Sequence, residues 1–157
     1  MKRKWKTLIL CLLLPVAVGA LSALLSRNGM RNFSQLEQPP LSPPAWLFPV
    51  VWTVLYLLMG LASWLVLESG KPEGTVTKAL QWYGAQLAAN FFWSIIFFRL
   101  ELYLTAFLWL ILLWVLILGT LLRFRRIQIS AGRLLVPYLA WVTFAGYLNL
   151  GVWLLNR

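Results

Sequence analysis

Five long runs of apolar residues, separated by short polar or basic segments, dominate this chain. Each run has about the 20 residues that an α-helix needs to cross the hydrocarbon core of a bilayer. The apolar–polar alternation of barrel strands is missing, and backbone groups in lipid must bond within their own segment, so each run is expected to be helical. The predicted spans cover residues 7–26, 43–67, 79–98, 102–122 and 131–155. The predicted fold is therefore an all-α integral membrane protein, a single domain over residues 1–157 built as a bundle of five transmembrane helices.

The segments between the runs carry the signals for helix ends. Ser42 followed by Pro43 predicts a helix start, with the serine as cap and the proline where no N–H is needed. Residues 99–101 form a very short link, so the third and fourth spans should be antiparallel neighbours. Pro137 should bend the fifth span. Residues 27–42 are polar and mixed, too long for a tight turn, and are expected to form a loop.

Composition supports a membrane protein and excludes an ordinary soluble globule. Hydrophobic residues make up 61% of the 157 residues, against about 45–50% in soluble domains. Mean hydropathy is +0.78. The formal net charge of +10 could indicate nucleic-acid binding, but in so apolar a chain it is better interpreted as loop charge that sets membrane orientation. No nucleic-acid partner is therefore expected.

The basic residues are divided unevenly between the two ends of the predicted bundle. The N-terminal segment and the links at 68–78 and 123–133 share one end and carry ten Lys and Arg, whereas the other end carries four. Because basic residues concentrate on the cytoplasmic side, we predict a cytoplasmic N-terminus, an outside C-terminus and an outer loop at 27–42, in a bacterial-type plasma membrane. The charged start also fits a cleaved signal peptide, but its apolar run is long and no A-x-A site follows, which favours a retained helix.

Several kinds of chemistry lack their residues. The sequence has no His and one Cys, Cys11, so it offers no zinc or iron–sulfur ligand set, no intramolecular disulfide and no His ligand for haem iron. No metal site and no obligatory cofactor are expected. None of the four Glu lies deep in an apolar run, which argues against a carboxylate proton relay. No acid–base pair or nucleophile–base set supports ordinary hydrolysis or group transfer.

Polar and aromatic residues share one face on three of the predicted helices. Gln86, Asn90 and Ser94 are spaced i, i+4, i+8, with Tyr83, Trp93 and Phe97 beside them. The second span carries Trp52, Tyr56, Met59 and Ser63, and the fifth carries Tyr138, Trp141, Ala145 and Asn149. Since unpaired amides are costly in hydrocarbon, these faces should point into the bundle.

Two interpretations of these faces remain open. Together they can line an apolar pocket with sparse hydrogen-bonding groups, which is typical of a ligand site. Alternatively, the polar groups only hold the helices together, while small residues such as Gly84 and Ala88 let helices approach closely.

Three stretches of sequence closely resemble the TspO/MBR family (tryptophan-rich sensory protein, translocator protein, peripheral benzodiazepine receptor-like). They are PPAWLFPVVWTVLYLLMG at 43–60, QLAANFFWS at 86–94 followed by Phe97 and Phe98, and PYLAWVTFA at 137–145 followed by Leu148 and Asn149. The resemblance covers essentially the whole chain in order. It implies a five-helix bundle, commonly a homodimer in the lipid bilayer, that binds porphyrins and other flat apolar molecules beneath the first loop.

The resemblance also implies which residues contact the ligand. Trp52, Asn90, Trp141 and Ala145 match family pocket positions, and Trp46, Tyr56, Phe97 and Asn149 adjoin them. The ligand-binding set that we predict adds Phe33, Gln86 and Trp93. The ligand class implied is a tetrapyrrole such as protoporphyrin IX or haem. The family resemblance further implies a light-dependent breakdown of porphyrin with Trp52 as the candidate catalytic, photochemical residue, which we treat as a side activity.

The first loop and the C-terminus depart from the family pattern. Two loop positions that are often Trp are Asn32 and Leu41 here, and an often-Tyr position is Phe33. Fewer stacking and hydrogen-bonding groups are therefore available to cover a ligand. The animal members' sterol motif, which needs a Tyr and then a basic residue, reads Leu150 and Leu154. Transport of the ligand, and a purely structural or regulatory role in which the polar faces serve packing and partner assembly, remain alternatives.

Overall fold

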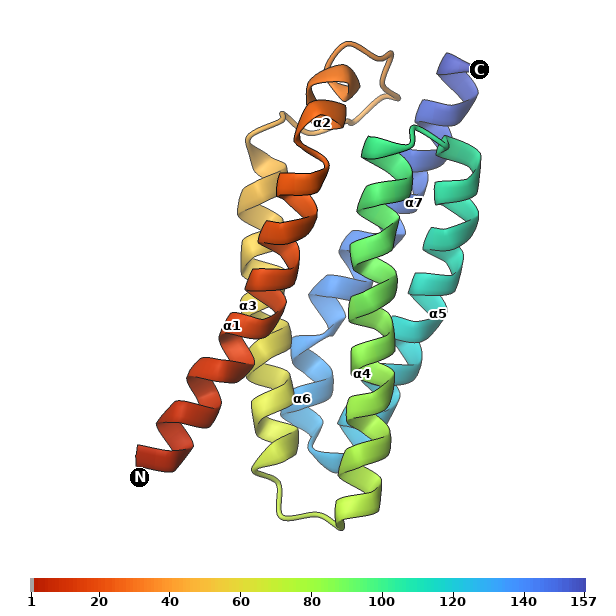
Figure 1. Cartoon of the computed structure of the whole chain (residues 1–157). Coiled ribbons are helices and arrows are strands. Elements are labelled where there is room, and N and C mark those ends of the chain that lie inside the picture. The colour runs from red at the N-terminus through yellow and green to blue at the C-terminus, as the bar shows by residue number, and fades with distance from the viewer. Residues whose placement is uncertain (1) are drawn as a thin grey trace.

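The computed structural model describes residues 2–157, and all regular elements in that range are helices, without strands (Figure 1). The long helices are α1 (Lys2–Leu25), α3 (Leu47–Leu67), α4 (Glu73–Ser94), α5 (Tyr103–Ile127) and α7 (Val136–Asn156). Shorter elements are α2 (Arg27–Phe33), the π-helix η1 (Ile95–Arg99) and α6 (Ile129–Leu134).

The long helices run up and down along one bundle (Figure 1). α1 packs mainly on α3, α4 on α5, and α5 on α7, while α6 contacts α3 and α5. The short link after η1 places α4 and α5 side by side and antiparallel, as predicted from residues 99–101. The N-terminus, the α3–α4 loop and the α5–α6 link lie at one end of the bundle, and the C-terminus and α2 lie at the other. The ten-to-four division of basic residues therefore separates the two ends as predicted.

Glycine sets the close approach of the first helix pair. A Cβ at Gly60 of α3 would collide with the backbone carbonyl of Cys11 on α1. Gly84, by contrast, has no neighbour near its missing side chain, and Ala88 is exposed. Gly84 and Ala88 therefore do not mediate a close approach between helices of the same chain, because this side of α4 faces away from them.

Four segments are long and apolar enough to cross a membrane: α1, α3, α5 and the α6–α7 segment Ile129–Asn156. α4 is not among them. It is 22 residues long, but its sequence carries glutamine, asparagine, threonine and charged residues that lower its hydropathy. The structure thus establishes an all-helical protein with four candidate membrane spans.

Several helix ends differ from the sequence-based boundaries. The segment 27–42, expected to be a loop throughout, begins with the two-turn helix α2. The predicted helix start at Ser42 and Pro43 is wrong: α3 begins at Leu47, and the Ser42 hydroxyl instead donates a 2.7 Å hydrogen bond to the Pro39 carbonyl within a turn. α4 begins at Glu73 rather than residue 79, because polar residues extend the helix beyond the apolar run.

The regular α-helical pattern is interrupted at two places, after α4 and between α6 and α7. α4 passes into η1, where the Leu100 amide bonds the Ile95 carbonyl at 2.9 Å, five residues back. The predicted bend at Pro137 is a full break at Leu135 between α6 and α7. Pro137 lies in the first turn of α7, where its missing N–H costs no helical hydrogen bond.

Candidate ligand-binding site

A chain of buried hydrogen bonds joins α3, α4 and α7. The Asn90 side-chain amide donates to the Tyr138 hydroxyl at 2.7 Å, and that hydroxyl donates to Gln86 Oε1 at 2.7 Å. Tyr56 donates a longer bond, 3.4 Å, to Asn90 Oδ1. Gln86 Nε2 lies 4.0 Å from the Met59 sulfur. Because Asn90, Gln86 and Tyr138 are each only 1% exposed, this network fixes the relative rotation of three helices in a place where unpaired polar groups are costly.

A second polar connection lies one turn nearer the outer loop. The Trp93 indole N–H donates to Asn149 Oδ1 at 3.1 Å. Asn149 in turn donates through Nδ2 to the Tyr103 carbonyl at 2.9 Å. All three residues contribute to the junction of α4, α5 and α7, so the predicted residues Trp93 and Asn149 directly contact each other.

Aromatic rings form a continuous cluster above this network. Phe33, at the end of α2, lies with its ring centroid 5.5 Å from Phe97 and 6.5 Å from Phe48. Phe48 contacts Trp141 at 5.9 Å, and Phe97 stacks on Trp93 at 5.3 Å. The cluster therefore connects α2, α3, α4, η1 and α7, and offers edges and faces of the kind that pair with planar ring systems.

Trp52 and Trp141 face the same region from two different helices. The Trp52 ring lies 5.6 Å from the Tyr56 ring and 6.2 Å from the Tyr138 ring. Trp141 is half-buried, and its indole N–H is one of the few buried side-chain donors in residues 2–157 that lack a hydrogen-bond partner. Ala145 lies one turn beyond Trp141 on α7 and is buried. The Trp141 N–H is therefore a free hydrogen-bond donor one turn from a small residue.

The loop after α2 is attached to the end of α7. Asn156 exchanges two hydrogen bonds with the Glu37 backbone, at 3.1 and 2.8 Å. Tyr147 donates to the Pro40 carbonyl at 2.7 Å. Pro39 packs against Gly151, where a Cβ would lie 2.6 Å from the proline ring. The loop therefore packs against α7 even though Leu41 points into solvent, 83% exposed.

Comparison with known proteins decides the family. The TspO/MBR family matches residues 11–154. The tryptophan-rich protein TspO of Chlorobaculum tepidum is 40% identical over 99% of both chains. The protein CrtK of Rhodobacter capsulatus is 36% identical, covering 88% of this chain and 85% of its own. The bovine translocator protein is 35% identical, covering 92% and 87%.

The chain belongs to the TspO/MBR family. Its apolar helices and its membership of this family make it an integral membrane protein. The resemblance found in the three sequence motifs is thus confirmed. The family match spans the first loop, so neither Asn32 nor Leu41 takes the chain out of the TspO/MBR family.

The structure brings most of the predicted ligand-binding residues together and leaves one apart. Nine of them share the hydrogen-bonded connections or the aromatic cluster: Phe33, Trp52, Tyr56, Gln86, Asn90, Trp93, Phe97, Trp141 and Asn149. Ala145 is buried in the core beside them. Trp46 precedes the first turn of α3 and is 66% exposed, away from the cluster. Whether these residues bind a ligand stays a prediction.

Two residues outside the predicted ligand-binding set complete the site. Tyr138 connects Asn90 with Gln86, and Phe48 connects Phe33 with Trp141. Tyr138 stands on the same stripe of α7 as Trp141 and Asn149, so the helical period already pointed to it. Phe48 gave no such signal, because its place depends on the fold of the loop before α3.

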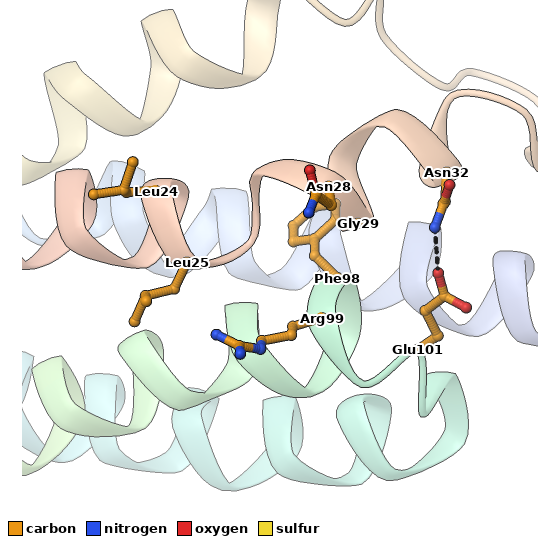
Figure 2. Close-up of a pocket in the computed structure, with 8 residues that line it drawn as sticks. All are labelled: Leu24, Leu25, Asn28, Gly29, Asn32, Phe98, Arg99 and Glu101. Atoms are coloured by element: carbon orange, nitrogen blue, oxygen red, sulfur yellow. Dashed lines mark hydrogen bonds between the residues drawn. The ribbon is translucent and has the colours of Figure 1, made fainter.

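Two open cavities lie outside this cluster. The larger, about 380 Å³, lies at the outer end between α1, α2 and η1. Figure 2 shows its lining, with Leu24 and Leu25 at one side and Asn32 bonded to Glu101 at 3.0 Å at the other. The second, about 240 Å³, lies between α4 and α5 at the basic end. Neither cavity is lined by a residue of the predicted ligand-binding set.

The arrangement favours binding over proton-transfer chemistry. No group of metal-binding side chains occurs among the described residues. The polar atoms near the cluster are amides, hydroxyls and indole N–H groups, which hydrogen-bond without changing charge at neutral pH. The arrangement therefore places a few uncharged hydrogen-bonding groups beside aromatic rings.

Proposed function

We propose that this TspO/MBR protein binds a flat, apolar ligand of the tetrapyrrole class, such as protoporphyrin IX or haem, between α3, α4 and α7. The observation that carries the proposal is the buried Trp141 N–H without a partner, set among the rings of Phe48 and Phe144. A lone buried donor in an aromatic surrounding is what a ligand carbonyl or carboxylate would satisfy.

The rings would supply most of the contact. Offset or edge-to-face aromatic pairs contribute about 0.5–1.5 kcal/mol each beyond burial. Phe33 is the movable part of the cover, because it sits at the end of the short helix α2 and touches the site through ring edges only. Its displacement would open the cluster beneath the loop without breaking the Asn90–Tyr138–Gln86 bonds.

The absence of histidine from the sequence gives this proposal a specific consequence. Without an imidazole to ligate iron, binding depends on shape and stacking. Iron-free protoporphyrin IX should therefore bind about as well as haem. Strict dependence on iron in a spectral titration would contradict this form of the proposal.

The proposed membrane arrangement adds α4 to the four apolar spans as a fifth crossing. Its polar residues face the bundle and are hydrogen-bonded there, so its low hydropathy is compatible with a lipid-surrounded position. The basic end, with ten of fourteen Lys and Arg, would face the cytoplasm of a bacterial cell, with the N-terminus inside and the C-terminus outside.

Substitution of two matched tryptophans tests the binding proposal. Trp141→Phe keeps the ring contact and removes the unpaired donor, so porphyrin affinity should fall about two- to tenfold, the value of one hydrogen bond. Trp64→Phe is the control, because Trp64 also has a buried N–H without a partner but its ring is not part of the aromatic cluster. Protoporphyrin quenching of tryptophan fluorescence, with a sterol as competitor, measures both affinities. Equal affinities for both variants and the unaltered protein would contradict a role for the Trp141 N–H.

A photochemical side activity has its own test at Trp52. An indole stacked on an excited porphyrin can donate an electron, and Trp52 is the tryptophan packed on both Tyr56 and Tyr138. Trp52→Phe should then slow light-dependent loss of bound protoporphyrin without abolishing binding. Unchanged loss under light would remove Trp52 from that role.

Transport has a separate test, because binding alone does not move a ligand across a membrane. Passage of protoporphyrin into liposomes should be faster with the protein than without it if the protein carries its ligand.

The internal bonding of the network favours a second candidate, a structural or regulatory role. Asn90, Gln86 and Tyr138 satisfy one another and need no ligand. If this network only assembles the helices, Asn90→Leu should lower stability while no specific porphyrin affinity exists to lose. Saturable binding by the unaltered protein decides between the two candidates.

A further inference from the structure

The cavity at the basic end has three cationic residues in its lining. It measures about 240 Å³ and lies between the first turns of α4 and the last turns of α5. Its lining consists of Gly74, Thr75, Lys78, Ala79, Arg123, Arg126 and Ile127. Three of these side chains are positively charged, and none of the acidic side chains of residues 2–157 lines it. Three cations held around one hollow repel each other unless an anion joins them.

The helical register explains why these cations converge. On α5, Gly119, Arg123 and Arg126 are spaced i, i+4, i+7 and share one face. On α4, Lys78 and Trp82 are spaced i, i+4 and also share one face. Because the two helices are antiparallel, the beginning of α4 lies beside the end of α5. The basic residues thus meet through helix packing.

Arg123 is held in place by its neighbours. Its guanidinium lies 4.6 Å from the centroid of the Trp82 ring. Trp82 can lie against α5 because residue 119 is glycine: a Cβ there would be 2.5 Å from the ring. Arg123 Nε is buried and has no acceptor within the part of the chain that the structure describes. A positioned guanidinium with a buried, unused donor points to an acceptor that comes from outside the protein.

We propose that this cavity binds the headgroup phosphate of an anionic phospholipid, with Arg123, Arg126 and Lys78 as its ligands. Guanidinium–phosphate bonds are charge-assisted and are among the stronger hydrogen bonds. Basic pockets between membrane helices are well suited to such headgroups. α5 continues from the cavity towards the bundle middle with the exposed apolar side chains Leu122 and Val115, along which an acyl chain can lie. This site lies at the opposite end of the bundle from the outer loop and its function does not depend on the proposed tetrapyrrole site.

Native mass spectrometry of the delipidated protein in detergent tests the proposal with defined lipids. Phosphatidylglycerol should bind the unaltered protein at least about tenfold more tightly than phosphatidylcholine. The double variant Arg123→Gln, Arg126→Gln should lose roughly 25-fold in phosphatidylglycerol affinity, because each cation near a membrane surface contributes about a fivefold factor. Its affinity for phosphatidylcholine should stay unchanged.

A matched control separates this site from general surface charge. Arg125 is on the same helix, exposed and outside the cavity. It packs against Gly132 through its Cβ, which glutamine retains. Arg125→Gln should leave phosphatidylglycerol affinity within about twofold of the original, since a charge outside the pocket makes no phosphate bond. An equal loss from Arg125→Gln would overturn the site in favour of diffuse charge.

Two further measurements keep the interpretation clear. Arg123→Lys keeps the charge and should retain part of the affinity, and helix content by circular dichroism should be the same for all variants. Soluble glycerophosphoglycerol should bind much more weakly than the lipid. If it bound equally well, or if phosphatidylcholine matched phosphatidylglycerol on the unaltered protein, the proposed phospholipid site would be wrong.

Discussion

α4 and α5 are neighbouring antiparallel helices of 22 and 25 residues that bury different kinds of side chain. α5 buries an almost wholly apolar stripe: Ala106, Leu110, Leu113, Ile117, Leu121 and Phe124. α4 buries Gln86, Asn90 and Ser94 together with aromatic rings. Of the two, only α5 is apolar enough to be recognised as a membrane span.

The difference shows that the hydropathy of these two helices follows what each one buries. α5 exposes apolar residues such as Leu108 and Val115, which suit contact with lipid. α4 turns the amides of Gln86 and Asn90 towards α3 and α7, where both find partners. A membrane helix can have low hydropathy because its polar side chains make contacts inside the bundle and do not face lipid.

The largest effect is expected from removing the hydroxyl that the α4 amides share. Tyr138→Phe leaves Asn90 Nδ2 and Gln86 Oε1 without their partner, so stability should fall by about 2 kcal/mol, above the usual value of a single hydrogen bond in a membrane protein. Thermal unfolding in detergent measures the loss. Tyr147→Phe is the control, because its hydroxyl bonds the Pro40 carbonyl at the surface, and should cost no more than about 1 kcal/mol. Equal losses of stability would mean that the buried α4 network contributes no more than the surface hydrogen bond of Tyr147.

A smaller effect is expected where α5 accommodates an aromatic ring of α4. Gly119→Ala places a methyl group 2.5 Å from the Trp82 ring. Overpacking of this kind costs about 1–2 kcal/mol, and the ring must shift from beneath Arg123. The same thermal unfolding assay detects the change. A variant as stable as the original would show that Trp82 is free to move and would weaken the case for a fixed Arg123.

The smallest effect, with the opposite sign, is expected on the outer side of α4. Gly84 has no atom near its missing side chain, and alanine is the better helix former. Gly84→Ala should therefore raise stability by about 0.5 kcal/mol. Unfolding of the monomer in detergent is the measurement. A clear loss of stability would instead reveal a helix packed against this side of α4.

The sequence predicted much of the bundle and part of the site. Spacing alone placed Gln86 and Asn90 on one inward face, and both are almost fully buried. The sequence-based prediction failed at helix ends, where local sequence signals do not decide which hydrogen bonds form. Ser42 before Pro43 satisfies the usual rule for a helix start, yet the hydroxyl bonds Pro39 and α3 begins at Leu47. α2 was missed because its seven residues carry no clear apolar period.

The amino-acid sequence by itself determined the helical class, the membrane character, the family and the inward faces, because bilayer thickness and the helical period leave few alternatives. Only the tertiary structure decided that Tyr138 serves both Asn90 and Gln86, that Trp141 keeps an unused donor, and that Arg123 rests on Trp82 beside a basic cavity. The physical reason is that a periodic pattern specifies which side of a helix is buried. The depth and rotation that bring one donor to one acceptor depend on how all the helices pack together.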